Sequence, residues 1–260
     1  MDYNRQNNKK FHMKKTKRIA LITGGAKRIG ASIARHLHHC GVDVMIHHNQ
    51  SSIDAKNLVA ELNNLRADSA ATIQADLLDQ ESFSYVIKEV INNFGQLDFL
   101  INNASTYYAT PIDSLNESSW NDLIGTNLKA PLLLSRHAVK YLKKTKGSII
   151  NITDAQIHNP KKNYIIYSIA KAGLATLTES LAKELSPEIR VNAIAPGAIL
   201  WPESNLDFDD DYRSKVISQT LLKRTGSPED ICKAIEFFLL HAPYVTGQTL
   251  STVSYTHLRA

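Results

Sequence analysis

Strand-like and helix-like patterns alternate along this chain. Six apolar runs rich in β-branched residues predict strands, at residues 19–23, 42–47, 70–74, 97–102, 148–153 and 190–195. Between them apolar residues recur three or four positions apart, which predicts amphipathic helices. Strands that alternate with helices form a parallel sheet covered on both faces. The sequence therefore predicts an α/β fold: a doubly wound, Rossmann-type parallel sheet in a single domain.

The chain is long enough for one such domain. Its 260 residues, 43% of them hydrophobic, can bury one sizeable core, and the composition does not shift after residue 17. We expect a disordered basic tail over 1–16, one domain over 17–252 and an atypical tail over 253–260. Much of the net charge of +5 lies in the lysine-rich stretch 9–18, before the first strand. This placement argues against a nucleic-acid partner.

Several other classes of protein find no support in the sequence. No run of 18 apolar residues could span a membrane, and the first residues resemble neither a secretion signal nor a transit peptide. Two cysteines are too few for a disulfide framework. Five histidines fall within residues 36–48, but we find no carboxylate or cysteine at ligand spacing from them, and His36, His38 and His39 cannot all face one ion from a single helix. We therefore expect a cytoplasmic protein with no metal site.

A glycine-rich run, Thr23-Gly-Gly-Ala-Lys-Arg-Ile-Gly30, joins the first predicted strand to the first predicted helix. Glycines at such a junction permit a tight turn and a close backbone approach. The N-terminus of the helix offers N–H groups and a positive dipole end to a pyrophosphate. Because the spacing is not the strict GxGxxG pattern, a plain strand-to-helix turn explains the run equally well when it is taken alone.

The end of the second strand indicates which dinucleotide would bind. An NAD-selective site carries an acidic residue there for the ribose hydroxyls, whereas residues 47–52 include none. Lys27 and Arg28 add positive charge nearby, and the polar side chains of residues 49–52 could hold a 2′-phosphate. This pattern favours NADP, although a solvated loop would have the same composition.

Polar and small residues also follow the later strands, at the edge where ligands bind in open α/β sheets. Asp76 and Leu77 follow the third strand, residues 102–105 the fourth, and the turn Pro196-Gly197 the sixth. An asparagine pair such as that at 102–103 is equally typical of a simple turn. Asn127 stands in a helical stretch, where a buried amide would need hydrogen-bond partners.

Tyr167 and Lys171 stand four positions apart and share one face of a predicted helix. A lysine ammonium beside a phenol stabilises the phenolate and lowers its pKa from about 10. Such a pair can exchange a proton near neutral pH, which suits hydride transfer. Asp154 precedes the tyrosine by thirteen positions.

Taken in order, TGGAKRIG, Asp76-Leu77, NNAS, Asn127, YSIAK and PG resemble the short-chain dehydrogenase/reductase family over residues 17–251. The resemblance implies that Tyr167 exchanges the substrate proton, that Lys171 holds the cofactor ribose and that Asn127 supports a water relay. It also implies a homo-oligomer, a tetramer. The serine that usually orients the substrate carbonyl is replaced here by Asp154.

That aspartate, together with Lys27-Arg28, residues 105–107 and Tyr164, resembles the pteridine reductase branch of the family. Those enzymes reduce dihydropterins, and some also biopterin and folates, with NADPH. By resemblance Asp154 activates the tyrosine or relays a proton, Tyr107 stacks on the pterin, and Arg28 contacts cofactor phosphate and substrate. A flat pterin with ring nitrogens on its edges suits an aromatic shelf, a carboxylate and an arginine.

The expected site residues fall into three groups. The catalytic residues are Asn127, Asp154, Tyr167 and Lys171. A small-molecule pterin would contact Arg28, Ser105, Tyr107, Asp154, Tyr164 and Tyr167. NADPH would contact Gly24, Lys27, Arg28, Ile29, Gly30, His48, Asn49, Gln50, Ser51, Asp76, Leu77, Asn103, Ala104, Ser105, Thr153, Tyr167, Lys171, Pro196, Gly197 and Ile199.

Two other functions stay open. A ketone or 3-oxoacyl reductase on the same fold would favour a serine at position 154 and an apolar pocket in place of Tyr107. A non-catalytic NADP-binding or regulatory protein would not need the intact Tyr167 and Lys171. Residues 251–260 also replace the Asp-Gly-Gly that the family carries after its last strand, which resembles residues 244–250 here. This departure concerns subunit packing more than chemistry.

Overall fold

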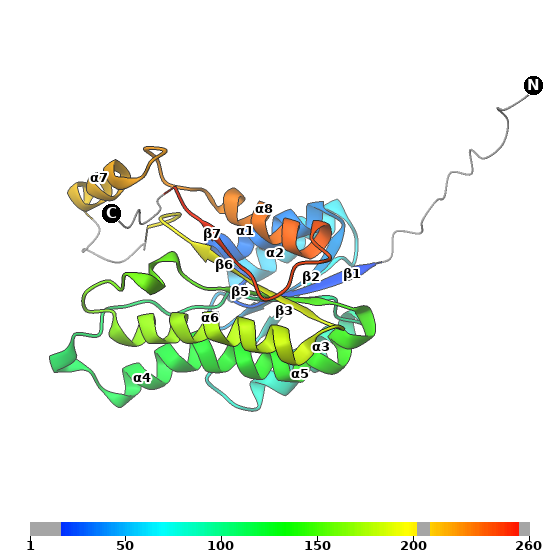
Figure 1. Ribbon diagram of the computed structural model, residues 1–260. Helices are drawn as coiled ribbons and strands as arrows, with labels where there is room; N and C mark the ends of the chain where they lie inside the picture. The colour runs from blue at the N-terminus through cyan, green and yellow to red at the C-terminus, as the bar shows by residue number, and fades with distance from the viewer. Residues whose placement is uncertain (1–16, 202–208, 255–260) are drawn as a thin grey trace, which may run out of the picture.

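The computed structural model describes residues 17–201 and 209–254, so the expected tail at 1–16 lies outside the described part of the chain. The strands are β1 (Arg18–Ile22), β2 (Val42–His48), β3 (Ala70–Gln74), β4 (Phe99–Asn102), β5 (Ser148–Ile152), β6 (Arg190–Pro196) and β7 (Thr249–Thr252). They form one parallel sheet in the order β3-β2-β1-β4-β5-β6-β7 (Figure 1). The predicted doubly wound α/β fold is confirmed.

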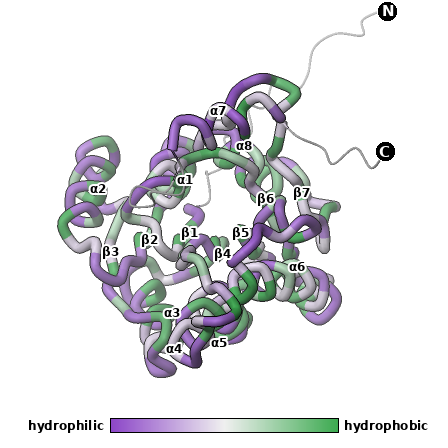
Figure 2. Tube along the Cα trace, turned by 90° about the vertical axis from the view of Figure 1, so that its left-hand side faces the viewer, coloured by the Kyte–Doolittle hydropathy of each residue, from purple (hydrophilic) through white to green (hydrophobic). Residues whose placement is uncertain are grey.

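Helices cover both faces of the sheet, as Figures 1 and 2 show. One face carries α1 (Arg28–His39), α2 (Ser52–Leu65) and α8 (Pro228–Glu236). The other carries α3 (Ser82–Phe94), α4 (Glu117–Ile124), α5 (Ala130–Thr145) and α6 (Ile165–Leu185). The remaining helix, α7 (Asp210–Gln219), lies beyond the carboxyl ends of the strands. Within the described residues, no helix is both long enough and apolar enough to cross a membrane.

Strands β1 to β6 each contribute to two separate cores because their side chains alternate between the faces. In β1, Ala20 and Ile22 pack with the helices α1, α2 and α8, while Ile19 and Leu21 pack with α3, α5 and α6. The strands are therefore apolar on both faces, which explains why they read as continuous apolar runs in the sequence.

The order of the strands reverses between β1 and β4. The chain winds outward from β1 through β2 to β3, and then returns to place β4 on the other side of β1. Loops that leave the carboxyl ends of β1 and β4 run in opposite directions, so a crevice opens between them. The glycine-rich run follows β1 at this point and leads into α1.

The end of the chain differs from its predicted position. The last strand is Thr249–Thr252 rather than residues 244–250, because Ser251 and Thr252 pair with Ala195 and Pro196 of β6. Ser254 also accepts a hydrogen bond from the backbone N–H of Leu221 at its carbonyl oxygen, over 2.7 Å. The atypical terminus thus completes the sheet edge through residue 252, and residues 255–260 lie outside the described part.

Candidate active site

Tyr167 and Lys171 lie in the first two turns of α6, one turn apart. The Tyr167 hydroxyl donates a hydrogen bond to Oδ2 of Asp154 over 2.7 Å. The Lys171 side chain is only 3% exposed, and its Nζ donates to the carbonyl oxygen of Ile152 over 2.9 Å. The structure therefore brings together three of the four predicted catalytic residues at the carboxyl end of β5.

Burial shifts the pKa values of both Tyr167 and Lys171 in the direction that favours the neutral side chain. Burial raises the pKa of Tyr167 well above 10, and the neighbouring Asp154 carboxylate raises it further. Burial also lowers the pKa of Lys171 to about 8. The expectation that Lys171 lowers the pKa of Tyr167 is wrong for this arrangement. The Lys171 Nζ lies 5.7 Å from the centre of the Tyr167 ring, whereas the Asp154 carboxylate accepts a hydrogen bond from the Tyr167 hydroxyl.

The Asp154 carboxylate is fixed by two contacts. It is the N-cap of a short 3-10 turn, Ala155–His158, and its Oδ1 accepts the backbone N–H of Gln156 over 2.7 Å. Its Oδ2 accepts the Tyr167 hydroxyl. Because each oxygen has a partner, the carboxylate plane is set before any substrate binds. A serine at this position would offer a single oxygen in place of the two carboxylate oxygens.

Three tyrosine rings form one wall of a small, closely packed cavity beside this carboxylate. The ring centroid of Tyr107 lies 4.6 Å from that of Tyr164 in a stacked pair, and 4.7 Å from that of Tyr167 in an edge-to-face pair. Such pairs fix ring orientation as well as burying apolar area. The predicted substrate residues Tyr107, Tyr164 and Tyr167 are thus brought together.

Sequence reasoning missed several residues at or near this cavity, among them Lys161 and Tyr212. Lys161 lines it, with its Nζ 4.6 Å from the ring centroid of Tyr164 and 5.2 Å from that of Tyr212. Tyr212 comes from α7, more than forty residues further along the chain. No motif marks either residue, because their meeting depends on how α7 folds back over the loop before α6.

Asn127 lies in a π-helical turn, Gly125–Lys129, between α4 and α5. The wider turn frees the carbonyl oxygen of Leu123, which accepts from Asn127 Nδ2 over 3.0 Å. The same amide also donates to the carbonyl oxygen of Thr106, and its Oδ1 accepts the Ser105 hydroxyl over 2.6 Å. The side chain is fully buried, and the predicted need for partners is confirmed.

The glycine loop is held to the end of β4 by side chains. The Thr23 hydroxyl accepts the backbone N–H groups of Asn103 and Ala104, over 2.9 and 3.0 Å. In return Asn103 Nδ2 donates to the carbonyl oxygens of Thr23 and Gly24. A Cβ on Gly30 would lie 2.1 Å from the carbonyl oxygen of Gly24, so the loop can close only with glycine there.

His47 completes the anchoring of this loop, a role that its place in a histidine-rich stretch did not suggest. Its Nδ1 accepts the backbone N–H of Gly24 over 3.2 Å, so the proton lies on Nε2, 3.1 Å from the carbonyl oxygen of Ala75. Burial lowers the pKa of His47 to about 4, which keeps the ring neutral in this role. The ring therefore connects the glycine loop to the end of β3.

The loop is suited to an anionic group. The first turn of α1 contains no acidic residue, and its N-cap, Lys27, makes no side-chain capping bond. These backbone N–H groups and the helix dipole would hold a pyrophosphate. A Cβ on Gly24 would approach the Ala104 Cα to 2.9 Å, so the loop packs tightly on the end of β4 and leaves its other side for a ligand.

The two cations of the loop already have protein partners. Lys27 Nζ lies 3.0 Å from Oδ2 of Asp54, an acid in the first turn of α2 that the stretch 47–52 did not include. Arg28 donates from Nη2 to the carbonyl oxygen of Trp201 over 2.9 Å. Both would have to reorient to reach a cofactor phosphate. Asn49 and Gln50 are exposed beside them.

The remaining predicted cofactor residues divide by their environment. Asp76 is exposed and its Oδ1 accepts the backbone N–H of Leu78, so it stabilises its own turn. Four of the others are buried, namely His48, Leu77, Thr153 and Ile199, and four are partly buried, namely Ile29, Ser51, Pro196 and Gly197. Whether any of these residues contacts a cofactor stays a prediction.

Residues 18–211 match the short chain dehydrogenase family. The chain belongs to this family. As a short-chain dehydrogenase it is an oxidoreductase that works with a nicotinamide dinucleotide, which agrees with the glycine loop and with the Tyr167–Lys171 pair. The predicted family resemblance is confirmed.

Individual relatives of this short-chain dehydrogenase have different substrates in their names. Pteridine reductase 1 of Leishmania tarentolae is 34% identical over 271 residues, covering 88% of this chain and 92% of that protein. A 3-oxoacyl-(acyl-carrier-protein) reductase FabG of Staphylococcus aureus is 36% identical over 244 residues, covering 92% and 97%. The FabG reductase of Staphylococcus epidermidis is 35% identical over 237 residues, covering 89% and 95%. Both kinds of relative are reductases, and their similar identities do not separate the pteridine branch from the other.

Proposed function

We propose that this short-chain dehydrogenase reduces pterins, converting a dihydropterin to a tetrahydropterin with NADPH. The observation that supports the proposal most directly is the 2.7 Å hydrogen bond from the Tyr167 hydroxyl to Asp154. It lies against a wall of tyrosine rings at the cavity that Lys171 also lines.

Simple carbonyl reduction needs a tyrosine whose proton points at the substrate oxygen. Here the proton points at Asp154, and the raised pKa of Tyr167 makes the phenol a weak acid. A carboxylate bonded to a phenol suits a substrate that takes its proton at a ring nitrogen and offers N–H groups in return. A dihydropterin has both. The aromatic wall would also match its flat faces.

The cofactor proposal depends on the loop between β1 and α1. NADPH supplies the hydride when it is bound. The first-turn N–H groups of α1 would hold its pyrophosphate, and Lys27 and Arg28 would meet its additional phosphate. Arg28 has a left-handed backbone, with φ of 52°, which favours glycine. An arginine in this conformation costs about 1 kcal/mol, which contacts of its side chain can offset.

The alternative function is reduction of a ketone or of a 3-oxoacyl thioester. The FabG relatives favour it, since they match 92% of the chain at 36% identity. Against it stand the carboxylate at position 154 and the narrow aromatic cavity, which suit a flat, nitrogen-rich ring better than a flexible acyl chain.

Parallel assays of NADPH oxidation would decide between the two functions. The substrates are dihydrobiopterin, dihydromonapterin, dihydrofolate, a panel of ketones and an acetoacetyl thioester. We expect turnover with at least one dihydropterin and little with the ketones. In Asp154→Ser, pterin turnover should fall about a hundredfold or more while NADPH affinity is kept.

Asp113→Ser is the matched control, since Asp113 is an exposed carboxylate outside the cavity. If Asp154→Ser reduced dihydropterins as fast as the parent, the pterin proposal would lose its main support. Ketone or thioester turnover that exceeds pterin turnover in the parent would favour the alternative.

We also infer that the protein is a homo-oligomer, and a tetramer is the state that its family resemblance implies. Large apolar side chains are exposed on three neighbouring helices: Trp120 of α4, Leu132 of α5, and Ile165 and Ile169 of α6. Burial of such a surface between copies would remove it from water. Light scattering during size-exclusion chromatography measures the mass, and a monomer at micromolar concentration would contradict this inference.

A further inference from the structure

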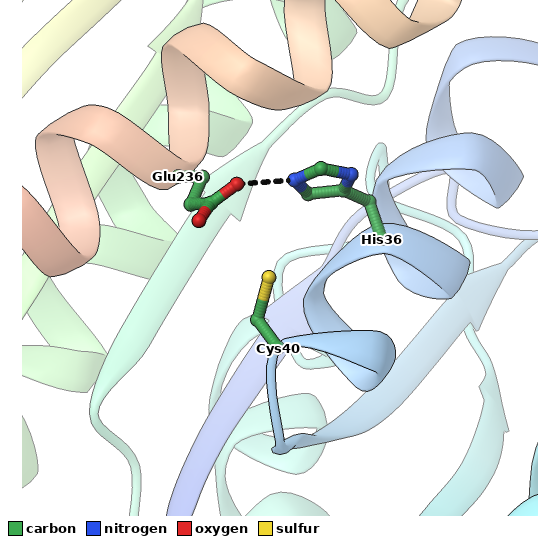
Figure 3. A group of neighbouring side chains, drawn as sticks. All are labelled: His36, Cys40 and Glu236. Atoms are coloured by element: carbon green, nitrogen blue, oxygen red, sulfur yellow. Dashed lines mark hydrogen bonds and ion pairs between the residues drawn. The ribbon is translucent and has the colours of Figure 1, made fainter.

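A cluster of three different side chains lies where the end of α1 meets the end of α8, away from the catalytic residues. His36 and Cys40 are one helical turn apart and face the same side. Glu236 is the last residue of α8. Figure 3 shows the imidazole, the thiol and the carboxylate directed toward a common space, and their ligand atoms all lie within 4.8 Å of one another.

The existing contacts within the cluster hold the donor atoms close together. His36 Nε2 lies 2.7 Å from Oε2 of Glu236, and His241 Nε2 lies 3.2 Å from the other oxygen, Oε1. Glu229 is more distant, with Oε1 3.9 Å from Nδ1 of His36. An ion pair between α1 and α8 would need only His36 and Glu236. The thiol of Cys40 adds a third donor that an ion pair does not require.

We propose that His36, Cys40 and Glu236 bind a zinc ion. Nitrogen, sulfur and oxygen donors of this kind are the ones that zinc takes in proteins, at about 2.0 to 2.3 Å from the metal in a tetrahedral arrangement. Ligand atoms at such a site are therefore about 3.3 to 3.8 Å apart. The separations here, from 2.7 Å to at most 4.8 Å, bracket that range, so small side-chain rotations would complete the geometry.

The charges and the surroundings of the cluster also fit zinc. Two anionic ligands, the Glu236 carboxylate and the Cys40 thiolate, balance a doubly charged ion, and the thiol proton passes to solvent when sulfur binds the metal. His241 would keep its hydrogen bond to the other carboxylate oxygen and so orient Glu236. Hydrogen-bond partners of the ligands have this role at many zinc sites. The side chains of His36 and Glu236 are 16% and 29% exposed, so the ion can enter and water can take the fourth position.

The expected role of the ion is structural. The cluster lies at the C-terminal end of α1, whereas the glycine loop enters the same helix at its N-terminal end. A zinc ion would connect helices whose ligands are 200 positions apart in sequence. The sequence prediction of no metal site held that no carboxylate or cysteine stands at ligand spacing from the histidines. It overlooked Cys40, which follows His36 by four positions, and nothing in the sequence points to Glu236.

The test uses the full chain after removal of metals with a chelator. Zn²⁺ is titrated in competition with a chromophoric chelator, and Co²⁺ serves as a spectroscopic probe because bonding to a thiolate gives a charge-transfer absorption band. We expect one Zn²⁺ per chain and a cobalt–thiolate band. At a hundredfold excess over the dissociation constant, the thermal midpoint should rise by about 5 °C or more. Saturation by Zn²⁺ should leave the affinity for NADPH unchanged.

Matched variants locate the site. Cys40→Ala should abolish the cobalt–thiolate band, and His36→Ala should weaken Zn²⁺ binding at least tenfold. Two controls should bind as the parent does: Cys232→Ala, which removes the buried thiol of α8, and His39→Ala, which removes an exposed imidazole of α1. Thermal midpoints without metal show whether each variant folds, and Glu236→Gln, which keeps the side-chain shape, replaces any variant that does not.

Three results would overturn the proposal. The first is that the parent takes up no Zn²⁺ at micromolar concentration. The second is that the cobalt–thiolate band persists in Cys40→Ala. The third is that His39→Ala loses as much affinity as His36→Ala, which would indicate adventitious binding by surface histidines.

Discussion

Lys171 provides a quantitative test of how this active site is built. Its ammonium group is almost completely buried, and its Nζ has one described hydrogen-bond partner, the carbonyl oxygen of Ile152. Burial lowers its pKa from 10.5 to about 8, against a smaller opposing effect of Asp154. Folding therefore makes the lysine harder to protonate. At neutral pH the lysine is still protonated, so its buried charge lowers the free energy of unfolding. Lys171→Met removes the charge and keeps much of the side-chain volume.

The magnitude follows from linkage between protonation and folding. Lowering the pKa from 10.5 to about 8 destabilises the folded state by about 3 kcal/mol at pH 7, where both states carry the proton. Between pH 8 and 10.5 the unfolded chain keeps a proton that the folded chain has released, so the stability of the parent rises with pH relative to Lys171→Met. The difference in unfolding free energy between the two proteins should change by about 2 kcal/mol from pH 7 to pH 9.5.

The assay is urea denaturation of both proteins at several pH values between 7 and 9.5. The lost hydrogen bond to Ile152 and the altered packing shift stability by an amount that does not depend on pH, so these effects cancel when the pH series is compared. Lys183→Met, at an exposed position of the same helix, is the control and should show no pH-dependent difference. A difference between parent and Lys171→Met that stays constant over this range would refute the reasoning.

Three further perturbations test other parts of the site. Tyr167→Phe removes the proton donor, so steady-state turnover should fall about a hundredfold or more while NADPH titration shows unchanged affinity. Asn127→Ala leaves buried partners such as the Leu123 carbonyl unsatisfied, and denaturation should show a loss of about 2 kcal/mol, which exposed Asn93→Ala should not. NADPH should bind more tightly than NADH in fluorescence titrations. Asp54→Asn should increase that preference about threefold, because it releases Lys27 from its ion pair. If the variant changed the affinity for both cofactors equally, Lys27 would not be a phosphate ligand.

The fold could be predicted from the sequence because its strands are buried on both faces. Largely apolar strands of four to seven residues, separated by segments with helical spacing, leave few other arrangements. The last strand was predicted a few residues too early, at residues 244–250. In the structure Ser251 and Thr252 pair with β6, and the sequence did not indicate this pairing. Edge strands are short and half exposed, so their pattern specifies register weakly.

The candidate site was predicted where neighbouring positions in sequence share a function, and missed where distant segments meet. Tyr167 and Lys171 lie one turn apart on α6, as their spacing indicated. Asp154 meets Tyr167 as the family resemblance implied. Lys161 and Tyr212 meet because the fold brings α7 close to the loop before α6. The direction of the Tyr167 pKa was also wrong, because the sequence could not show that the carboxylate lies closer to the phenol than the ammonium does.

A series of hydrogen bonds between buried polar side chains explains how helix α6 keeps its position on the sheet. Asn102 of β4 donates to Oδ1 of Asn151 in β5 over 2.8 Å, and Asn151 donates to the hydroxyl of Thr178 in α6 over 2.9 Å. Apolar contacts alone would allow α6 to slide along the sheet, because they are not directional. Sliding by one turn would take the Thr178 hydroxyl away from the buried amide of Asn151, at a cost of about 1 to 3 kcal/mol. These hydrogen bonds therefore fix the position of α6 along the sheet. They thereby fix where the Tyr167 and Lys171 side chains lie and how far the phenol is from Asp154.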